Sequence, residues 1–480
     1  MATKSFDYAL RSQHCSKVTG FSIRNLALSN LRRILSRTGI FVCALAIAMS
    51  LTETSNAQVV EWIRTLGHDS LNEGNGVVTD GVGNIYIAGR TTDTIGAVNF
   101  GKSDAIVSKY DSTGALQWST QIGTAEADLA YGITLDQSGG IYIAGLTDGS
   151  LGTPLGQVDA FVAKLNENGA LLWTKQFGTN EPDIAKSISA DGLGNVYVTG
   201  WTEGSLGASH KWSYDVFLSK YDSSGTPIWN RQIGTMEEDQ AHAVSTDLLG
   251  NIYIAGYSTG DLGGGNAGHS DAFVAKYDSS GNQIWITSLG SNNLDQARGI
   301  VVDNAGNVFI TGRTEGNLGG PNAGGTDAFL SKLDGAGNQQ WSRQLGTSLF
   351  DDSYGITVDP LGNVLISGVT GGTLGESSLG LQDVLVAAYD TAGNQLWIEQ
   401  FGTNRDDRGL AIAADGLGNA YITGFLNDRV LFAGDPHEMF LAKIVIPEPS
   451  GITLALVSFA LLVAGRPYFL SRRRIGQSKA

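Results

Sequence analysis

Six aspartates recur at one position of a repeating pattern and are the most regular candidates for chemistry in this chain. Each follows, by five residues, a glycine that closes an apolar segment; the first copy has Asn72 there, and the others have Asp128, Asp183, Asp239, Asp295, Asp351 and Asp407. Hard cations such as Ca²⁺ take oxygen ligands, so six carboxylates converging on a channel mouth would hold one. The alternative is structural, because a turn aspartate also accepts hydrogen bonds from its own backbone. Recurrence in every copy but one favours the structural role and makes Ca²⁺ the weaker hypothesis.

A second candidate is a group of four rings that interrupts the regularity. Trp201, His210, Trp212 and Tyr214 fall in one connection between two apolar segments, where other copies have glycine-rich connections. Exposed aromatic side chains stack on sugar rings or anchor a protein partner. The alternative is that these rings fold back onto their own segments. We expect ligand binding where the copies differ, so this connection is a predicted binding site.

A regularly spaced series of tryptophans predicts the strands that position these residues. Trp62, Trp118, Trp173, Trp229, Trp285, Trp341 and Trp397 are spaced by 56, 55, 56, 56, 56 and 56 residues. Each unit holds four apolar segments of strand length; in the second unit they are 131–136, 140–145, 159–164 and 171–178. Four antiparallel strands make one blade, and repetition around an axis protects the sheet edges. The pattern predicts an all-β fold, a seven-bladed β-propeller with four antiparallel strands per blade.

The incomplete last unit predicts how the ring closes. Its first three segments end near Ile444, and the sequence changes character at Pro447 before another tryptophan is due. A surplus segment, Val59 to Gly67, lies at the other end and carries Trp62 with no partner segments before it. We therefore expect the N-terminal strand to complete the last blade.

Turn chemistry distinguishes the two faces of the predicted disc. Aspartate followed by glycine recurs between the first and second segments of each unit, as at Asp136, and in most units between the third and fourth, as at Asp111. Such pairs form tight hairpins, which would share one face. The other two connections are longer and more varied, and varied loops on a rigid scaffold are where ligands usually bind.

The repeated segments resemble a known bacterial family. Gly-Asn-Ile-Tyr-Ile-Ala-Gly89 and Asp271-Ala-Phe-Val-Ala-Lys276 are similar to the SBBP-type β-propeller repeat, over roughly residues 59 to 446. The resemblance implies a propeller on exported or surface proteins, and it implies no common enzymatic activity. We accordingly expect a propeller domain at residues 58–446.

The two ends of the chain have the features of targeting signals. Residues 1–57 contain an apolar run from Ile40 to Leu51 after several arginines, followed by Ser55-Asn56-Ala57, which predicts a signal peptide. At the other end, Pro447, Glu448 and Pro449 precede a short apolar run and a basic cluster in residues 447–480. This order resembles the PEP-CTERM sorting signal, which implies transient inner-membrane anchoring and processing by an exosortase. The permanent single-span anchor is the alternative, but the apolar run is shorter than the roughly 20 residues that a spanning helix needs.

The net charge of the chain limits the classes of partner that we expect. Residues 58–449 hold 19 basic against 45 acidic residues, a formal charge of −26, which repels nucleic acid. We expect an exported, non-enzymatic binding or scaffolding module at the cell surface or in the extracellular matrix, monomeric and without a cofactor, whose partner is exopolysaccharide or a surface protein. The alternative is a lyase or hydrolase acting on extracellular polysaccharide with carboxylates at the channel mouth.

Overall fold

The computed structural model describes residues 60–67, 70–96, 98–209, 213–375, 378–427 and 437–446, all within the second of two compact units, Gln58–Ala480. Every regular element in these ranges is a β-strand, and no helix long and apolar enough to cross a membrane occurs in them. The predicted leader at residues 1–57 and the predicted sorting tail at residues 447–480, with Pro447, Glu448 and Pro449, lie outside the described residues.

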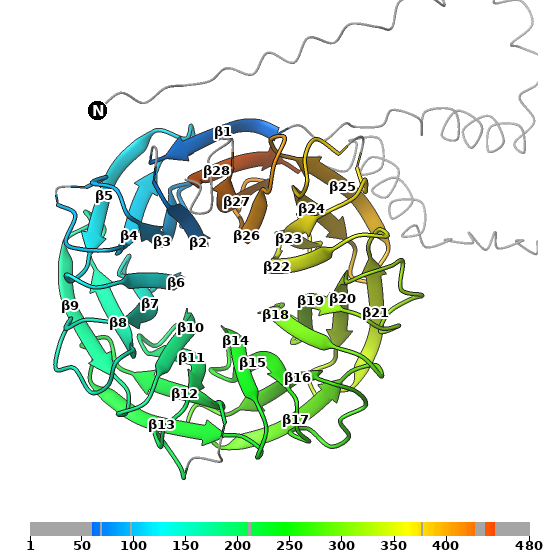
Figure 1. The fold of residues 1–480 in the computed structure, drawn as a ribbon, viewed down its shortest axis with the longest axis horizontal. Coiled ribbons are helices and arrows are strands. Elements are labelled where there is room, and N and C mark those ends of the chain that lie inside the picture. The colour runs from blue at the N-terminus through cyan, green and yellow to red at the C-terminus, as the bar shows by residue number, and fades with distance from the viewer. Residues whose placement is uncertain are drawn as a thin grey trace, which may run out of the picture. The chain divides into compact units, whose positions relative to one another are not determined.

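The strands form seven separate four-stranded antiparallel sheets around one axis (Figure 1), which confirms the predicted seven-bladed β-propeller. The innermost strands, here called strands a, are β2 (Asn72–Thr79), β6 (Asp128–Leu135), β10 (Asp183–Ala190), β14 (Asp239–Thr246), β18 (Asp295–Val302), β22 (Asp351–Val358) and β26 (Arg408–Ala414). Strands b are β3 (Ile85–Thr91), β7 (Ile141–Thr147), β11 (Val196–Thr202), β15 (Ile252–Ser258), β19 (Val308–Thr314), β23 (Val364–Thr370) and β27 (Asn419–Leu426). Strands c are β4 (Asp104–Tyr110), β8 (Asp159–Leu165), β12 (Asp215–Tyr221), β16 (Asp271–Tyr277), β20 (Asp327–Leu333), β24 (Asp383–Tyr389) and β28 (Glu438–Val445). The outermost strands d are β5 (Leu116–Ile122), β9 (Leu171–Phe177), β13 (Pro227–Ile233), β17 (Gln283–Leu289), β21 (Gln339–Leu345), β25 (Gln395–Phe401) and β1 (Val60–Leu66).

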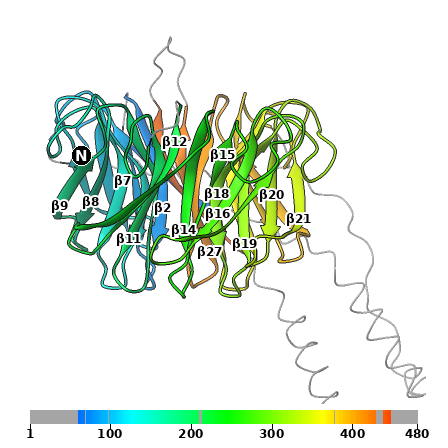
Figure 2. The same ribbon diagram turned by 90° about the horizontal axis from the view of Figure 1, so that it is seen from below.

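The ring closes between the two ends of the propeller, as the sequence predicts. The first strand, β1, pairs antiparallel with β28, and Trp62 and Leu66 face Lys443 and Met439 in the register. The seventh sheet therefore has the order β1-β28-β27-β26 and contains strands from both chain ends (Figure 1). The side view in Figure 2 shows the strands of the blades running between the two faces of the ring. Pairing β1 here also removes the free sheet edge that β28 would otherwise present.

The tight turns owe their shape to the repeated aspartates. Asp80 Oδ1 accepts hydrogen bonds from the backbone N–H of Val82, at 3.1 Å, and of Asn84, at 2.8 Å. Gly83 supplies the positive φ of 91° that the turn requires. The same bonds recur at every turn between strands a and b, so these aspartates are structural.

The core consists of seven apolar clusters, most of which combine side chains of neighbouring blades. Strands b and c are almost fully buried, and in six of the seven blades the tryptophan of strand d packs against a tyrosine or phenylalanine of strand b. Trp173 also reaches the next blade, where its Nε1–H donates to the carbonyl oxygen of Ser223 at 3.4 Å. Blade-to-blade contact explains why the tryptophan spacing is so regular.

Each strand b contains a glycine that the strand packing requires. A Cβ on Gly145 would overlap the carbonyl oxygen of Leu129 in strand a, where the pairing register shifts. We expect Gly145→Ala to lower the free energy of unfolding by more than about 3 kcal/mol, because the clash is with backbone that cannot move alone. Chemical denaturation measures this, and Gly81→Ala, where a Cβ has open space, is the matched control. Equal stability of the two variants would contradict this packing.

Candidate functional site

The six recurring aspartates lie at the starts of strands a, or just before β26 in the last blade. Asp128 is fully buried, and its Oδ2 accepts from Thr124 N at 2.6 Å and Thr124 Oγ1 at 2.9 Å. The same arrangement with a threonine or serine holds Asp183, Asp239, Asp295, Asp351 and Asp407. Among the described residues, no three or more His, Cys, Asp or Glu side chains gather as a metal site. The carboxylates therefore cap their own turns, which is the structural role that the sequence analysis favours.

The structure pairs these aspartates with a second series that the sequence analysis did not single out. Asp104, which begins strand c of the preceding blade, lies near Asp128, and its charge raises the pKa of Asp128, although burial is the larger cause. Asp104 Oδ2 accepts from Phe100 N at 2.9 Å and from Gln121 Nε2 at 3.0 Å. Two buried carboxylates thus meet at the junction between blades.

The predicted aromatic site is brought together only in part. Trp201 lies in strand β11, not in the connection that follows, and its ring is 4.5 Å from that of Tyr214 at an angle of 59°. Both rings are partly exposed. His210 and Trp212 lie outside the described residues.

Two short stretches match the sequences of enzyme motifs but not the structures in which those motifs act. Residues 96–103 read Gly-Ala-Val-Asn-Phe-Gly-Lys-Ser, the order of a phosphate-binding loop, but they connect β3 to β4 and no helix follows. Residues 256–260 read Gly-Tyr-Ser-Thr-Gly, the order of a nucleophile elbow, yet Ser258 is only 2% exposed and its hydroxyl bonds to Gly260. Neither stretch is placed for the chemistry of its motif.

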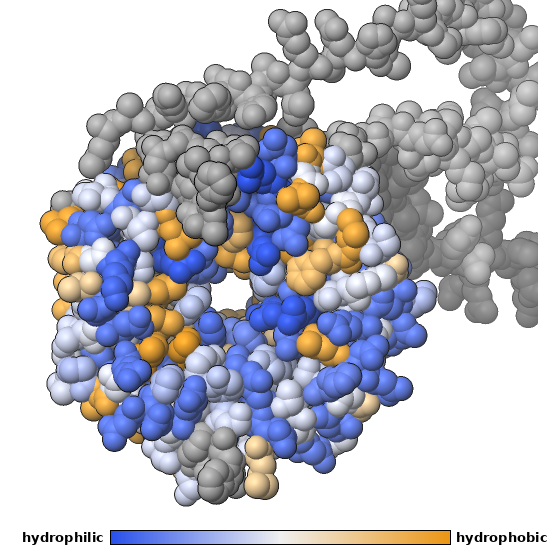
Figure 3. Space-filling model, viewed as in Figure 1, coloured by the Kyte–Doolittle hydropathy of each residue, from blue (hydrophilic) through white to orange (hydrophobic). Residues whose placement is uncertain are grey.

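The least regular side chains of the propeller lie on the inner strands. Each strand a has a β-bulge that adds one residue, and bulges commonly redirect side chains near binding sites. All seven added residues are partly exposed, and the inner strands surround the central opening visible in Figure 3. They are Asn75, Tyr131, Lys186, His242, Arg298, Tyr354 and Leu410. Unlike the aspartates, this position differs in chemistry from each blade to the next.

Cations gather on one side of this channel. Arg298 Nη2 and Arg313 Nε both donate to the side-chain oxygen of Gln296, each at 3.2 Å, so one amide holds two guanidinium groups close together. Arg298 Nε lies 3.9 Å from Asp352 Oδ2 and, like Arg408 Nε, is buried without a hydrogen-bond partner among the described residues. We name the group the channel cluster; its members are Lys186, His242, Arg298, Arg313, Asp352 and Arg408.

Burial and mutual charge shift the pKa values of this cluster. Burial raises the pKa of Asp352 to about 6, although Arg298, Arg313 and Arg408 pull that pKa downward. Burial and then Arg298 lower the pKa of Lys186 to about 8, and its Nζ lies 3.9 Å from the ring centre of Tyr131. Burial, followed by the nearby cations, holds the pKa of His242 well below its ordinary value, so this imidazole is neutral. The cluster is therefore cationic at neutral pH, with one carboxylate among four basic side chains.

The other side of the channel carries no comparable excess. Arg90 donates to both carboxylate oxygens of Glu73, at 2.9 and 2.8 Å, and His437 Nδ1 lies 3.6 Å from Glu73. Leu129 and Leu146 occupy the equivalent pair in the next blade. The sequence analysis missed the channel cluster; the signal for it was the varied residue three places after each recurring aspartate.

A line of strand b side chains adds rings to this cationic wall. Trp201, Tyr257 and Arg313 occupy the same register position in three successive blades. The ring of Tyr257 stacks on His242 at 5.6 Å, and its hydroxyl donates to Glu238 at 2.5 Å. Flat aromatic faces and guanidinium groups together suit a ligand that has rings and negative charges.

Comparison with known proteins agrees with the repeat structure. The family described as "Beta-propeller repeat" (SBBP) matches six stretches, at residues 61–96, 117–152, 172–207, 228–263, 284–319 and 340–376. Each stretch runs from a strand d into strands a and b of the next blade, so the repeats expected from the sequence are confirmed.

Individual relatives match only in part. An uncharacterized WD repeat-containing protein L264 of Acanthamoeba polyphaga mimivirus is 28% identical over 230 residues, 36% of this chain and 16% of that protein. Regulatory protein FlaEY of Caulobacter vibrioides is 27% identical over 162 residues, 30% of this chain and 17% of that protein. The matched parts are about a sixth of the length of these relatives. The WD40 domain of Pan2 from Neurospora crassa aligns with a TM-score of 0.47 at 9% identity, over 79% of this chain and 90% of that domain.

Proposed function

We propose that this β-propeller repeat protein is an exported, non-enzymatic binding module that receives an acidic ligand in its central channel. The observation that carries the proposal is the channel cluster, where Arg298 and Arg313 share one acceptor, and where the buried Nε–H groups of Arg298 and Arg408 have no hydrogen-bond partner among the described residues. Guanidinium groups form strong, directional hydrogen bonds with carboxylate, sulfate and phosphate. A ligand with such groups would satisfy these donors.

Electrostatics supports a specific site inside an otherwise repelling molecule. Residues 58–449 have a formal charge of −26, so the outer surface does not attract polyanions. A concave wall of one sign focuses the field locally, and Lys186, Arg298, Arg313 and Arg408 outnumber Asp352 and Glu238 on this wall. The selectivity of the channel would thus come from the positions of its basic side chains and not from the net charge of the protein.

The ligand class we favour is an acidic saccharide of the cell surface or matrix. Trp201, at the register position that Arg313 occupies two blades on, has a partly exposed ring, and sugar rings commonly stack on such faces while their acid groups bind arginines. The predicted signal peptide and the resemblance of residues 447–480 to an exosortase-processed tail place the protein outside the inner membrane in this proposal. Both rest on the sequence alone.

The test is calorimetric titration with an oligogalacturonate or a sulfated hexasaccharide against a neutral cello-oligosaccharide. We expect binding of the acidic probes alone, weakening with salt. Affinity should rise as pH falls from 9 to 5, because Lys186, beside Arg298 and Tyr131, gains its proton near pH 8 and Asp352, facing three arginines and Tyr354, loses its charge near pH 6. Equal affinity for the neutral probe, or affinity that increases with pH, would refute the proposal.

One observation favours an enzyme as the second candidate. Asp352 is a buried carboxyl group whose pKa of about 6 is close to neutrality, beside Tyr354 and three arginines, and perturbed acids of this kind occur at catalytic sites. A lyase or hydrolase of acidic polysaccharide would use this group as an acid or base. Release of unsaturated or reducing ends from the bound probe, abolished in Asp352→Asn, would replace the non-enzymatic proposal.

A further inference from the structure

The strongest unexplained feature outside the channel is a set of buried carboxylate oxygens between blades. In five of the seven blades the aspartate that begins strand c is at most 1% exposed, and its Oδ1 is buried without a hydrogen-bond partner among the described residues. They are Asp104, Asp159, Asp271, Asp327 and Asp383. An orphaned charged oxygen is costly, so a repeated one requires a physical explanation.

Each of these oxygens lies beside the recurring aspartate of the next blade. A Cβ placed on Gly178 would stand 2.8 Å from Asp159 Oδ1 and 2.5 Å from Asp183 Oδ2. At Gly402 the corresponding distances are 2.9 Å to Asp383 Oδ1 and 2.6 Å to Asp407 Oδ2. Only glycine leaves room for both carboxylates, which lie close to one another beside it.

Two adjacent buried carboxylates need either a shared proton or a cation. The propeller also carries a large excess of acidic residues, which a bound cation would reduce. A hard cation with oxygen ligands therefore fits the junctions better than a proton.

We propose that the aspartate pairs between successive blades are Ca²⁺ sites that join the blades. In each, the inner oxygen of the strand c aspartate and the carboxylate of the recurring aspartate supply the acidic ligands, while backbone or water oxygens complete the shell. This role is independent of ligand binding in the channel. It also assigns the recurring aspartates a function in addition to turn capping.

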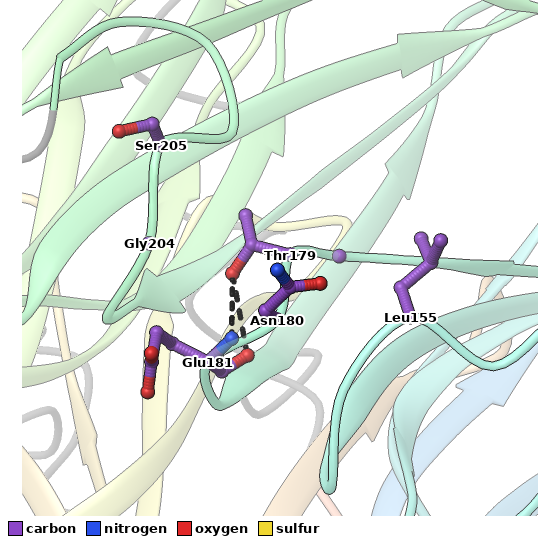
Figure 4. Close-up of a pocket in the computed structure, with 7 residues that line it drawn as sticks. Leu155, Thr179, Asn180, Glu181, Gly204 and Ser205 are labelled. Carbon is purple, nitrogen blue, oxygen red and sulfur yellow. Dashed lines mark hydrogen bonds between the residues drawn. The ribbon is translucent and has the colours of Figure 1, made fainter.

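A pocket of about 480 Å³ lies beside one such junction. Figure 4 shows its lining, which includes Leu155, Thr179 and Glu181, and Gly178 of the junction also belongs to it. Leu155 N donates to Asp159 Oδ2 at 2.8 Å and Thr179 N to Asp183 Oδ2 at 2.5 Å. The backbone at this pocket therefore binds one oxygen of each aspartate, while Asp159 Oδ1 is buried without a hydrogen-bond partner among the described residues.

The junction that closes the ring is a natural control. It has Asn72 in place of the aspartate, and Thr91 Oγ1 donates to Asn72 Oδ1 at 2.6 Å. Asn72 Nδ2 donates to Ser70 O and to Asp93 Oδ2, both at 3.1 Å. An amide satisfies its neighbours here without an ion, so this junction is not assigned as a site.

The test measures calcium bound to the purified full chain by equilibrium dialysis with elemental analysis, together with thermal unfolding. We expect about five Ca²⁺ per chain and a midpoint at least about 5 °C higher in millimolar CaCl₂ than in EDTA, with less effect from MgCl₂. The double variant Asp104→Asn/Asp128→Asn should bind one ion fewer. Asp111→Asn, an exposed turn aspartate of the same blade, should bind the full number, and Asp271→Asn/Asp295→Asn repeats the test at another junction.

The outcome that overturns the proposal is also defined. If the pairs share protons, no Ca²⁺ binds and the midpoint is insensitive to EDTA. Because burial raises the pKa of Asp104, Asp128 and Asp407 in the folded state, the protonated pairs would then stabilise the fold at low pH, and the midpoint would fall as pH rises through about 6. Calcium bound equally by the double variant and the parent would likewise refute these sites.

Discussion

Replacing Arg298 and Arg313 together by alanine is expected to weaken binding of an acidic oligosaccharide at least about 100-fold, or about 3 kcal/mol. Each guanidinium group that bonds a charged ligand group contributes about 1.5–3 kcal/mol, and the two are held side by side by Gln296. The change leaves the buried Asp352 with Arg408 as its remaining arginine, so thermal unfolding must first show that the variant is folded. Calorimetric titration of parent and variant with the same probe gives the ratio directly.

The matched control is an arginine on the outer rim of the same protein. Arg343 lies in strand β21, where its Nε–H donates to Gly393 O at 2.8 Å in the neighbouring blade. Arg343→Ala removes one positive charge outside the channel, against two in the double variant, so affinity for the acidic probe should stay within about twofold. If Arg343→Ala weakens binding as much as the double variant does, the attraction comes from net charge, and the channel cluster is not the site.

Deleting residues 60–66 is expected to abolish cooperative unfolding of the propeller or to lower its midpoint by more than about 10 °C. The deletion removes β1 and all its hydrogen bonds to β28, together with Ile63, which packs in the core between the last two blades. It also exposes the edge of β28, and free edges promote aggregation. Differential scanning calorimetry and light scattering measure the two effects.

A substitution in the same strand distinguishes the effect of ring closure on stability from the effect of a single local charge. Glu61 Oε2 forms an ion pair with Lys443 Nζ at 2.7 Å, and Glu61 is half exposed. Exposed ion pairs contribute about 0–1 kcal/mol, so Glu61→Gln should leave the midpoint nearly unchanged. A strand deletion that unfolds at the parent temperature would show that the ring does not depend on β1.

Much of this architecture was predictable because it depends on residues that are close together in the sequence. The spacing of the tryptophans and the four apolar segments per unit specify blades, since each blade repeats the same contacts with its neighbours. The position of Trp62, without strands before it, predicted a closure that the register of β1 and β28 confirms. Aspartate–glycine turns such as Asp80 to Gly83 are equally local, because the aspartate bonds to backbone only two to four residues away.

The candidate sites were less predictable, because their members are distant in the chain. Asp104 and Asp128 belong to different blades, and no short motif marks two carboxylates that meet only when those blades pack. Trp201 was expected in a connection but belongs to strand β11, since strand pairing extends further than the glycine pattern suggests. His242 showed no metal-ligand spacing in the sequence, yet a bulge brings it into the channel wall with Arg298 and Lys186.

The sequence by itself thus determined the repeat, the blade count, the closure and the turns, all of which depend on periodicity and on bonds between near neighbours. The tertiary structure alone decided which side chains share the channel and which carboxylates share a junction. The reason is that a one-residue bulge in strand a changes the face of the sheet on which a side chain lies. The spacing of the repeats does not reveal where such a bulge occurs. Chemistry in this protein is expected where the copies differ, at the bulged residues, and where two blades bring like charges together.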